Sequence, residues 1–126
     1  MLSNFFWVVT LCLGTTFVHT LCTVAILVWL DSASFVHWTT RNAFTRGMLL
    51  AGLVLGMSLV AYLQAMLWAL FYLTAGALPS LEDAIYFSLV TFTTLGYGDI
   101  TLDPQWRVAG AFQAANGIIL FGWTTA

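Results

Sequence analysis

The chain has 126 residues, with three basic and five acidic side chains and a net charge of −2. Hydrophobic residues make up 61 % of it and charged residues 6 %, whereas about a quarter of a soluble domain is charged. So few charges exclude a soluble globular surface. With only three basic side chains and a negative net charge, the chain has no basis for a nucleic-acid-binding patch. We therefore expect a protein whose solvent is lipid.

Three stretches contain no charged side chain, and a helix needs about 20 apolar residues to cross a bilayer core. They are Met1–Leu30, Gly47–Leu81 and Val108–Ala126. A cleavable signal peptide is the alternative for the first stretch. However, this stretch lacks a basic start, and its apolar run is about twice the length of a signal-peptide core. We predict an all-α membrane protein with three transmembrane helices.

The first predicted helix runs from about Phe5 to Leu30. His19 lies midway along it and has two possible roles. It either senses protons, because histidine titrates near physiological pH, or it forms a hydrogen bond across a helix interface. Cys12 and Cys22 are about 15 Å apart along such a helix, too far for a disulfide, so we interpret them as packing residues.

A polar loop, Asp31–Arg46, follows this helix and carries two arginines. Cytoplasmic loops are enriched in lysine and arginine, which places this loop inside the cell and the N-terminus outside. The second helix is predicted over residues 47–75. Gln64 lies near its middle, where an amide usually forms a hydrogen bond with a neighbouring helix.

The next apolar stretch, Leu81–Leu95, is too short to span and suits a re-entrant segment. Ser80 is a suitable N-cap, and Glu82 and Asp83 fall in the first turn, where carboxylates favour the helix dipole. We therefore predict a short helix over residues 80–93 that starts at the outer surface and points inward. A last membrane helix is predicted over residues 106–126.

The segment between these two helices carries the chemistry. Non-helical backbone at membrane depth survives only inside protein or along a water-filled path. Gly96 and Gly98 flank Tyr97, and glycine accepts a positive φ without steric cost. Alternating backbone handedness in such a segment points successive carbonyls the same way.

In this segment the chain resembles the potassium channel pore-domain family, whose filters are four loops reading Thr-Val-Gly-Tyr-Gly. The corresponding residues here are Thr94, Leu95, Gly96, Tyr97 and Gly98, with Asp99 after them. The resemblance is nearest to small bacterial two-transmembrane channels and covers residues 47–126. It implies an outer helix at 47–75, a pore helix at 80–93, a filter at 94–99 and an inner helix at 106–126. Residues 1–46 would then be an additional helix and cytoplasmic loop.

The resemblance also implies roles for individual residues. Carbonyls of the filter would coordinate K⁺, which is the only bound species expected, from Thr94, Leu95, Gly96 and Tyr97. Tyr97 would brace the filter against the pore helix near Tyr86 and Phe87, and Tyr86 would form a hydrogen bond with Asp99. Two positions depart from the family pattern. Leu95 replaces the usual valine, and Val90 replaces a glutamate that some members place behind the filter.

The last helix resembles the family's inner helix. Gly117 matches its hinge glycine, although a packing role is an equal alternative, and Phe121-Gly122 matches a recurrent pair. Helical spacing places Ile118, Gly122 and Thr125 on one face, which we expect to turn toward the ion cavity. Family inner helices continue to a cytoplasmic gate and a basic tail, so this chain is either a minimal channel or part of a longer one.

The sequence thus predicts a homotetrameric potassium channel in a bacterial inner or plasma membrane, surrounded by lipid. A non-selective cation channel is one alternative, although the Gly-Tyr-Gly motif is intact. A non-conducting regulatory or assembly subunit is another. One possible role of the first helix is to bind an unidentified regulatory partner. We expect no enzyme, because zinc-ligand spacing, a nucleophile elbow and a phosphate-binding loop are all missing from the sequence.

Overall fold

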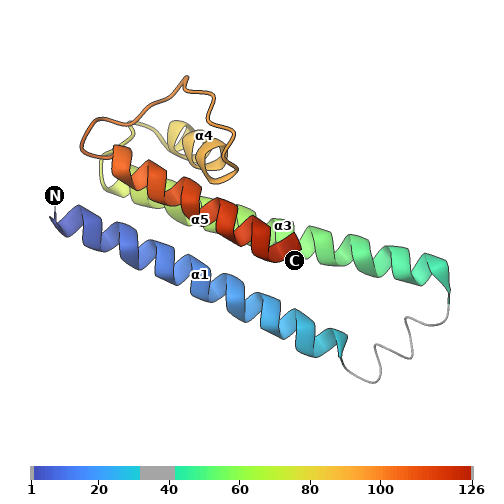
Figure 1. Ribbon diagram of the computed structural model, residues 1–126. Helices are drawn as coiled ribbons and strands as arrows, with labels where there is room; N and C mark the ends of the chain where they lie inside the picture. Colours follow the sequence, from blue (N-terminus) through green and yellow to red (C-terminus); the bar gives the residue numbers. More distant parts are fainter. Residues whose placement is uncertain (1, 32–41, 126) are drawn as a thin grey trace.

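The computed structural model describes residues 2–31 and 42–125, and side chains over 5–31 and 42–123. These described residues form four helices. The helices are α1 (Leu2–Leu30), α3 (Ala43–Thr74), α4 (Leu81–Phe92) and α5 (Arg107–Thr125). The short α4 packs against α3 and α5, and α1 packs along α5 (Figure 1). The described residues include no strand.

The order of the helices along the bundle fits the predicted topology. The start of α1, the segment after α4 and the start of α5 all lie at the same end of the molecule (Figure 1). The chain between α4 and α5 therefore leaves and re-enters the bundle at one end. This is the arrangement expected of a re-entrant hairpin between two spanning helices.

Local capping sets the ends of α3 and α4. The Ser80 side chain accepts a hydrogen bond from the Asp83 amide at 3.0 Å, which confirms the predicted N-cap of α4. The start predicted for α3, residue 47, is wrong by four residues. The Asn42 side chain accepts a hydrogen bond from the Thr45 amide at 2.9 Å and caps the helix there. Residues 43–46, assigned to the loop, are therefore the first turn of α3.

Two helices in the described part of the chain are long and apolar enough to cross a membrane, over Phe5–Leu30 and Ala43–Thr74. Their large apolar side chains point outward; Phe17 is 64 % exposed and Leu55 70 % exposed. This distribution suits a lipid environment. At 19 residues α5 is shorter, and it buries two amide side chains, those of Gln113 and Asn116.

A buried amide joins α3, α4 and α5. The Tyr72 hydroxyl donates a hydrogen bond to Gln113 Oε1 at 2.9 Å. Gln113 Nε2 donates to the hydroxyl of Ser88 at 2.7 Å and to its carbonyl at 3.2 Å. The Ser88 hydroxyl in turn donates to the Ala65 carbonyl at 2.5 Å. All three side chains are fully buried, so this junction fixes α4 against the two longer helices.

A second polar junction attaches α1 to the other helices. Gln64 Nε2 donates a hydrogen bond to the Thr15 carbonyl at 3.1 Å, as expected of a mid-membrane amide. Asn116 Nδ2 donates to Thr15 Oγ1 at 2.6 Å, and the Thr16 hydroxyl donates to Asn116 Oδ1 at 3.1 Å. The middle of α1 is therefore held by both α3 and α5.

Gln113→Leu is expected to lower the free energy of unfolding by about 1–3 kcal/mol, because it removes the acceptor of the buried Tyr72 hydroxyl and the donor to Ser88. Equilibrium unfolding in detergent measures this change. Gln105→Leu, the same substitution at an exposed linker position, is the control and should change stability by less than about 0.5 kcal/mol. Equal stability of the two variants would contradict the assignment of the junction.

Candidate functional site

The backbone after α4 alternates in handedness. Thr94, Gly96 and Gly98 have φ values of 60°, 57° and 78°, while Leu95 and Tyr97 between them are not in the positive-φ region. A positive φ is uncommon for a threonine and costs free energy, and such strain concentrates at functional sites. The two glycines adopt it at little cost. The alternating handedness inferred from the Gly-Tyr-Gly motif is therefore present. It begins at Thr94, two residues before the first glycine of the motif.

The amide groups at the start of this segment bind back to the end of α4. Thr94 N–H donates to the Thr91 carbonyl at 3.0 Å, and the amides of Leu95 and Gly96 donate to the Val90 carbonyl at 2.9 and 3.3 Å. No donor in the described part of the chain reaches the carbonyls of residues 94–97. The segment thus has its first donors satisfied and its acceptors available.

All residues from Thr93 to Asp99 are exposed in the single chain. The large side chains of Leu95 and Tyr97 are 56 % and 67 % exposed. Tyr97 forms no ring pair with Tyr86 or Phe87 within the described residues; Phe87 instead packs edge-to-face on Tyr72, with ring centroids 5.2 Å apart. The bracing of the segment by Tyr97 therefore stays a prediction.

Asp99 is held by the helix that precedes the segment. The Tyr86 hydroxyl of α4 donates a hydrogen bond to Asp99 Oδ2 at 2.5 Å, which is the contact predicted from the resemblance. This bond lowers the pKa of Asp99 below its ordinary value of 3.8 and raises the pKa of Tyr86 above 10.0. The carboxylate therefore stays ionised at neutral pH, and its contact fixes the far end of the segment to α4.

Tyr86→Phe is expected to raise the pKa of Asp99 toward 3.8. Because the pKa in the folded protein is lowered, the contact stabilises the fold above pH 3.8 and loses this effect as the pH falls through the folded pKa. The stability difference between the wild type and this variant should thus be present at neutral pH and vanish in acid.

Unfolding of both proteins across a pH series measures that difference. Tyr62→Phe, which removes a hydroxyl from an exposed tyrosine of α3, is the matched control. A stability difference that is the same at neutral and acid pH would contradict the role of the Asp99 carboxylate.

The helix α5 meets α4 at a glycine. A Cβ on Gly117 would overlap the Phe92 carbonyl oxygen and lie 2.9 Å from the carbonyl carbon. Phe92 is the last residue of α4, so α5 touches the chain directly before the alternating segment. Gly117 therefore has the packing role, and the structure does not test whether it is also a hinge.

The other residues expected on the inner helix differ in their surroundings within the described residues. Ile118 is 60 % exposed, and no atom lies within 4 Å of a Cβ built on Gly122. Phe121 packs against Phe92 with ring centroids 5.7 Å apart. Thr125 ends α5, and its side chain lies outside the described residues.

Gly117→Ala is expected to lower the free energy of unfolding by about 1–3 kcal/mol, as overpacking does, because the methyl group must displace the Phe92 backbone. Gly122→Ala on the same helix meets open space and is expected to raise stability by up to about 1 kcal/mol through helix propensity. Chemical unfolding of the two variants should thus give changes of opposite sign. Changes of the same sign would contradict the close approach of α5 to α4.

Sequence reasoning missed Asn116, Gln113 and the role of Thr15. The available signal was the spacing: two amides three residues apart on an otherwise apolar helix share one face. That face predicts buried polar contacts. Their partners on α1 and α4 are set by the tertiary arrangement, which spacing does not give.

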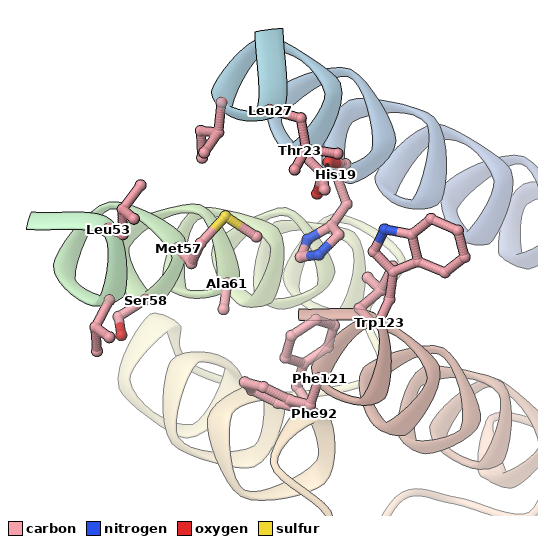
Figure 2. A pocket seen from close by; sticks show the side chains of 13 residues that line it. His19, Thr23, Leu27, Leu53, Met57, Ser58, Ala61, Phe92, Phe121 and Trp123 are labelled. Atoms are coloured by element: carbon pink, nitrogen blue, oxygen red, sulfur yellow. Dashed lines mark hydrogen bonds between the residues drawn. The ribbon is translucent and has the colours of Figure 1, made fainter. Parts of the chain in front are cut away.

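His19 also lies inside the molecule, where it is 2 % exposed. It lines a cavity of about 690 Å³ among α1, α3 and α5 together with Thr23, Met57 and Trp123 (Figure 2). The imidazole comes from α1 and points toward the other two helices (Figure 2). A hydrogen-bonding role and a proton-sensing role both remain predictions.

The described residues contain no group of His, Cys, Asp and Glu side chains that could hold a metal ion. The family model described as "ion channel" matches residues 5–126, which is nearly the whole chain and includes α1. The chain therefore belongs to this ion channel family and is a membrane protein, as the resemblance predicted. No curated protein and no solved structure matches it.

Proposed function

We propose that the protein is a potassium-selective channel that conducts K⁺ passively through a filter formed by residues 94–98. The observation that carries the proposal is the alternating backbone at Thr94, Gly96 and Gly98, next to carbonyls that accept no hydrogen bond in the described part of the chain. Carbonyls of this kind replace the hydration shell of K⁺. The Gly-Tyr-Gly motif favours this selectivity over a non-selective cation channel.

Four copies around one axis complete the pore, because each chain supplies one wall of the filter. The exposed Tyr97 side chain supports this assembly, since a neighbouring copy could cover it. A cavity of about 320 Å³ lies behind the segment, lined in part by Gly96, Asp99 and Arg107. In the homotetramer, filter side chains pack behind the carbonyls, and lipid contacts the outside.

Ions shed water at the filter, and neighbouring ions push each other onward. The C-terminal end of α4 lies at the filter base, where its dipole favours a cation. Acidic side chains, from Glu82, Asp83, Asp99 and Asp103, flank the outer end of this path and attract cations. Arg41 and Arg46 support an orientation with their loop in the cytoplasm and the N-terminus outside, which we propose for a bacterial plasma membrane.

Potassium efflux from liposomes tests the proposal. Purified protein in KCl-loaded vesicles diluted into NaCl should give K⁺-driven flux that barium blocks. Gly96→Ala should abolish this flux, because a side chain at φ 57° strains the filter backbone; no atom of the same chain lies within 4 Å of the new Cβ.

Gly76→Ala is the matched control. Gly76 also has a positive φ, 67°, but it lies in the turn after α3 rather than in the filter. This variant should keep the flux. Normal selective flux from Gly96→Ala would overturn the filter assignment, and a confirmed tetramer without flux in the wild type would favour the non-conducting subunit.

A further inference from the structure

The side-chain hydrogen bonds between α1 and α5 both involve Asn116, near the middle of α1. Both ends of the Asn116 amide are bonded to α1, through Thr15 at 2.6 Å and Thr16 at 3.1 Å. Asn116 is 6 % exposed and Thr15 1 % exposed. In a bilayer core no water replaces such a bond, so a lost partner leaves a polar group unsatisfied.

The same turn of α5 touches the base of the filter. Gly117 follows Asn116 directly and lies against the Phe92 backbone, so closely that a Cβ at this position would overlap the Phe92 carbonyl oxygen. Phe92 ends α4, and the Thr94 amide bonds to Thr91 one residue before it. A shift of α5 at this level therefore moves the backbone from which the filter starts.

The two sides of the junction differ, because an aromatic pair joins α1 and α5 on one side and a cavity lies on the other. Toward the start of α1, Phe5 packs edge-to-face on Phe112 of α5, with ring centroids 5.8 Å apart. One turn after Thr15, His19 faces the cavity of about 690 Å³, and Trp123 lies on its α5 side (Figure 2). The cavity leaves room for side chains of α5 to move on this side, so the Asn116 junction acts together with the Gln113 junction one turn earlier to set the position of this helix next to the filter.

We infer that α1 contributes to ion selectivity by holding α5 in place and that Asn116 is a positioning residue for the filter. The helix α1 holds Asn116, which keeps Gly117 against Phe92 and so fixes the backbone spacing at Thr94. This inference rests on the proposed potassium channel function. Without the junction, the filter base loosens and its carbonyls discriminate less well between K⁺ and Na⁺.

The test compares K⁺ and Na⁺ flux from full-length tetramers in liposomes. Asn116→Leu removes both hydrogen bonds to α1 at similar side-chain volume. We expect it to lower the K⁺/Na⁺ flux ratio on the order of tenfold, within the usual range of coupling between sites. Gln105→Leu is the control, because it replaces an amide by leucine at an exposed position outside both junctions. It should leave the ratio unchanged.

A double-mutant cycle separates the effect of the hydrogen bonds between α1 and Asn116 on the flux ratio from general destabilisation. Thr15→Val with Thr16→Val should lower the ratio as Asn116→Leu does, and the triple variant should show no further loss. Should Asn116→Leu fail to assemble, Thr16→Val removes a single bond and should still lower the ratio.

Three outcomes would overturn the inference. A wild-type ratio in Asn116→Leu, with only lower thermal stability, would make the junction structural and leave the proposed function intact. A wild-type ratio in Thr16→Val, if that is the variant that assembles, has the same consequence. A wild type without K⁺ flux removes the proposed function and this inference together.

Discussion

The structure depends on how a non-helical segment satisfies its backbone inside a membrane protein. Hydrocarbon offers no hydrogen bonds, so each free amide or carbonyl at that depth is costly. Here the amides of Thr94, Leu95 and Gly96 bond to carbonyls at the end of α4. Their own carbonyls accept nothing within the described chain, so they are available to the cation of the proposed function.

That arrangement requires α4 to be held firmly, and buried amides do this. Gln113 connects α4 to α3 and α5, while Asn116 connects α5 to α1. Apolar packing has little preference between protein and lipid tails, so polar side chains and small residues specify which helices meet. Gly117 lets α5 approach the end of α4 closely, at the Phe92 backbone. The helix α1, which lies within the matched family region, is thus integrated into the bundle.

The elements and the site motif were predictable because they are local. Ser80, the charge-free stretches and the Gly-Tyr-Gly motif each act over a few residues, and the helices end within a few residues of the expected positions except at the start of α3. That end was missed because Asn42 was interpreted as part of a polar loop rather than as a cap. The Tyr86–Asp99 contact was predicted only through the family resemblance.

Tertiary contacts were beyond sequence reasoning. The partners of Gln113 and Asn116 depend on the rotation of α5 about its axis, and no local rule sets that rotation. The packing of Phe87 on Tyr72, rather than beside Tyr97, has the same origin. The sequence favoured neither the hinge role nor the packing role of Gly117, because its closeness to Phe92 appears only when α4 and α5 are placed together.

The central claim is that backbone carbonyls of the segment after α4 select K⁺. The reversal potential of single-channel current in a planar bilayer, with KCl on one side and NaCl on the other, tests it most directly. A reversal potential close to the equilibrium potential of K⁺ is the predicted result. Current that reverses near zero voltage under the same gradient would show that K⁺ and Na⁺ pass equally and would contradict the claim.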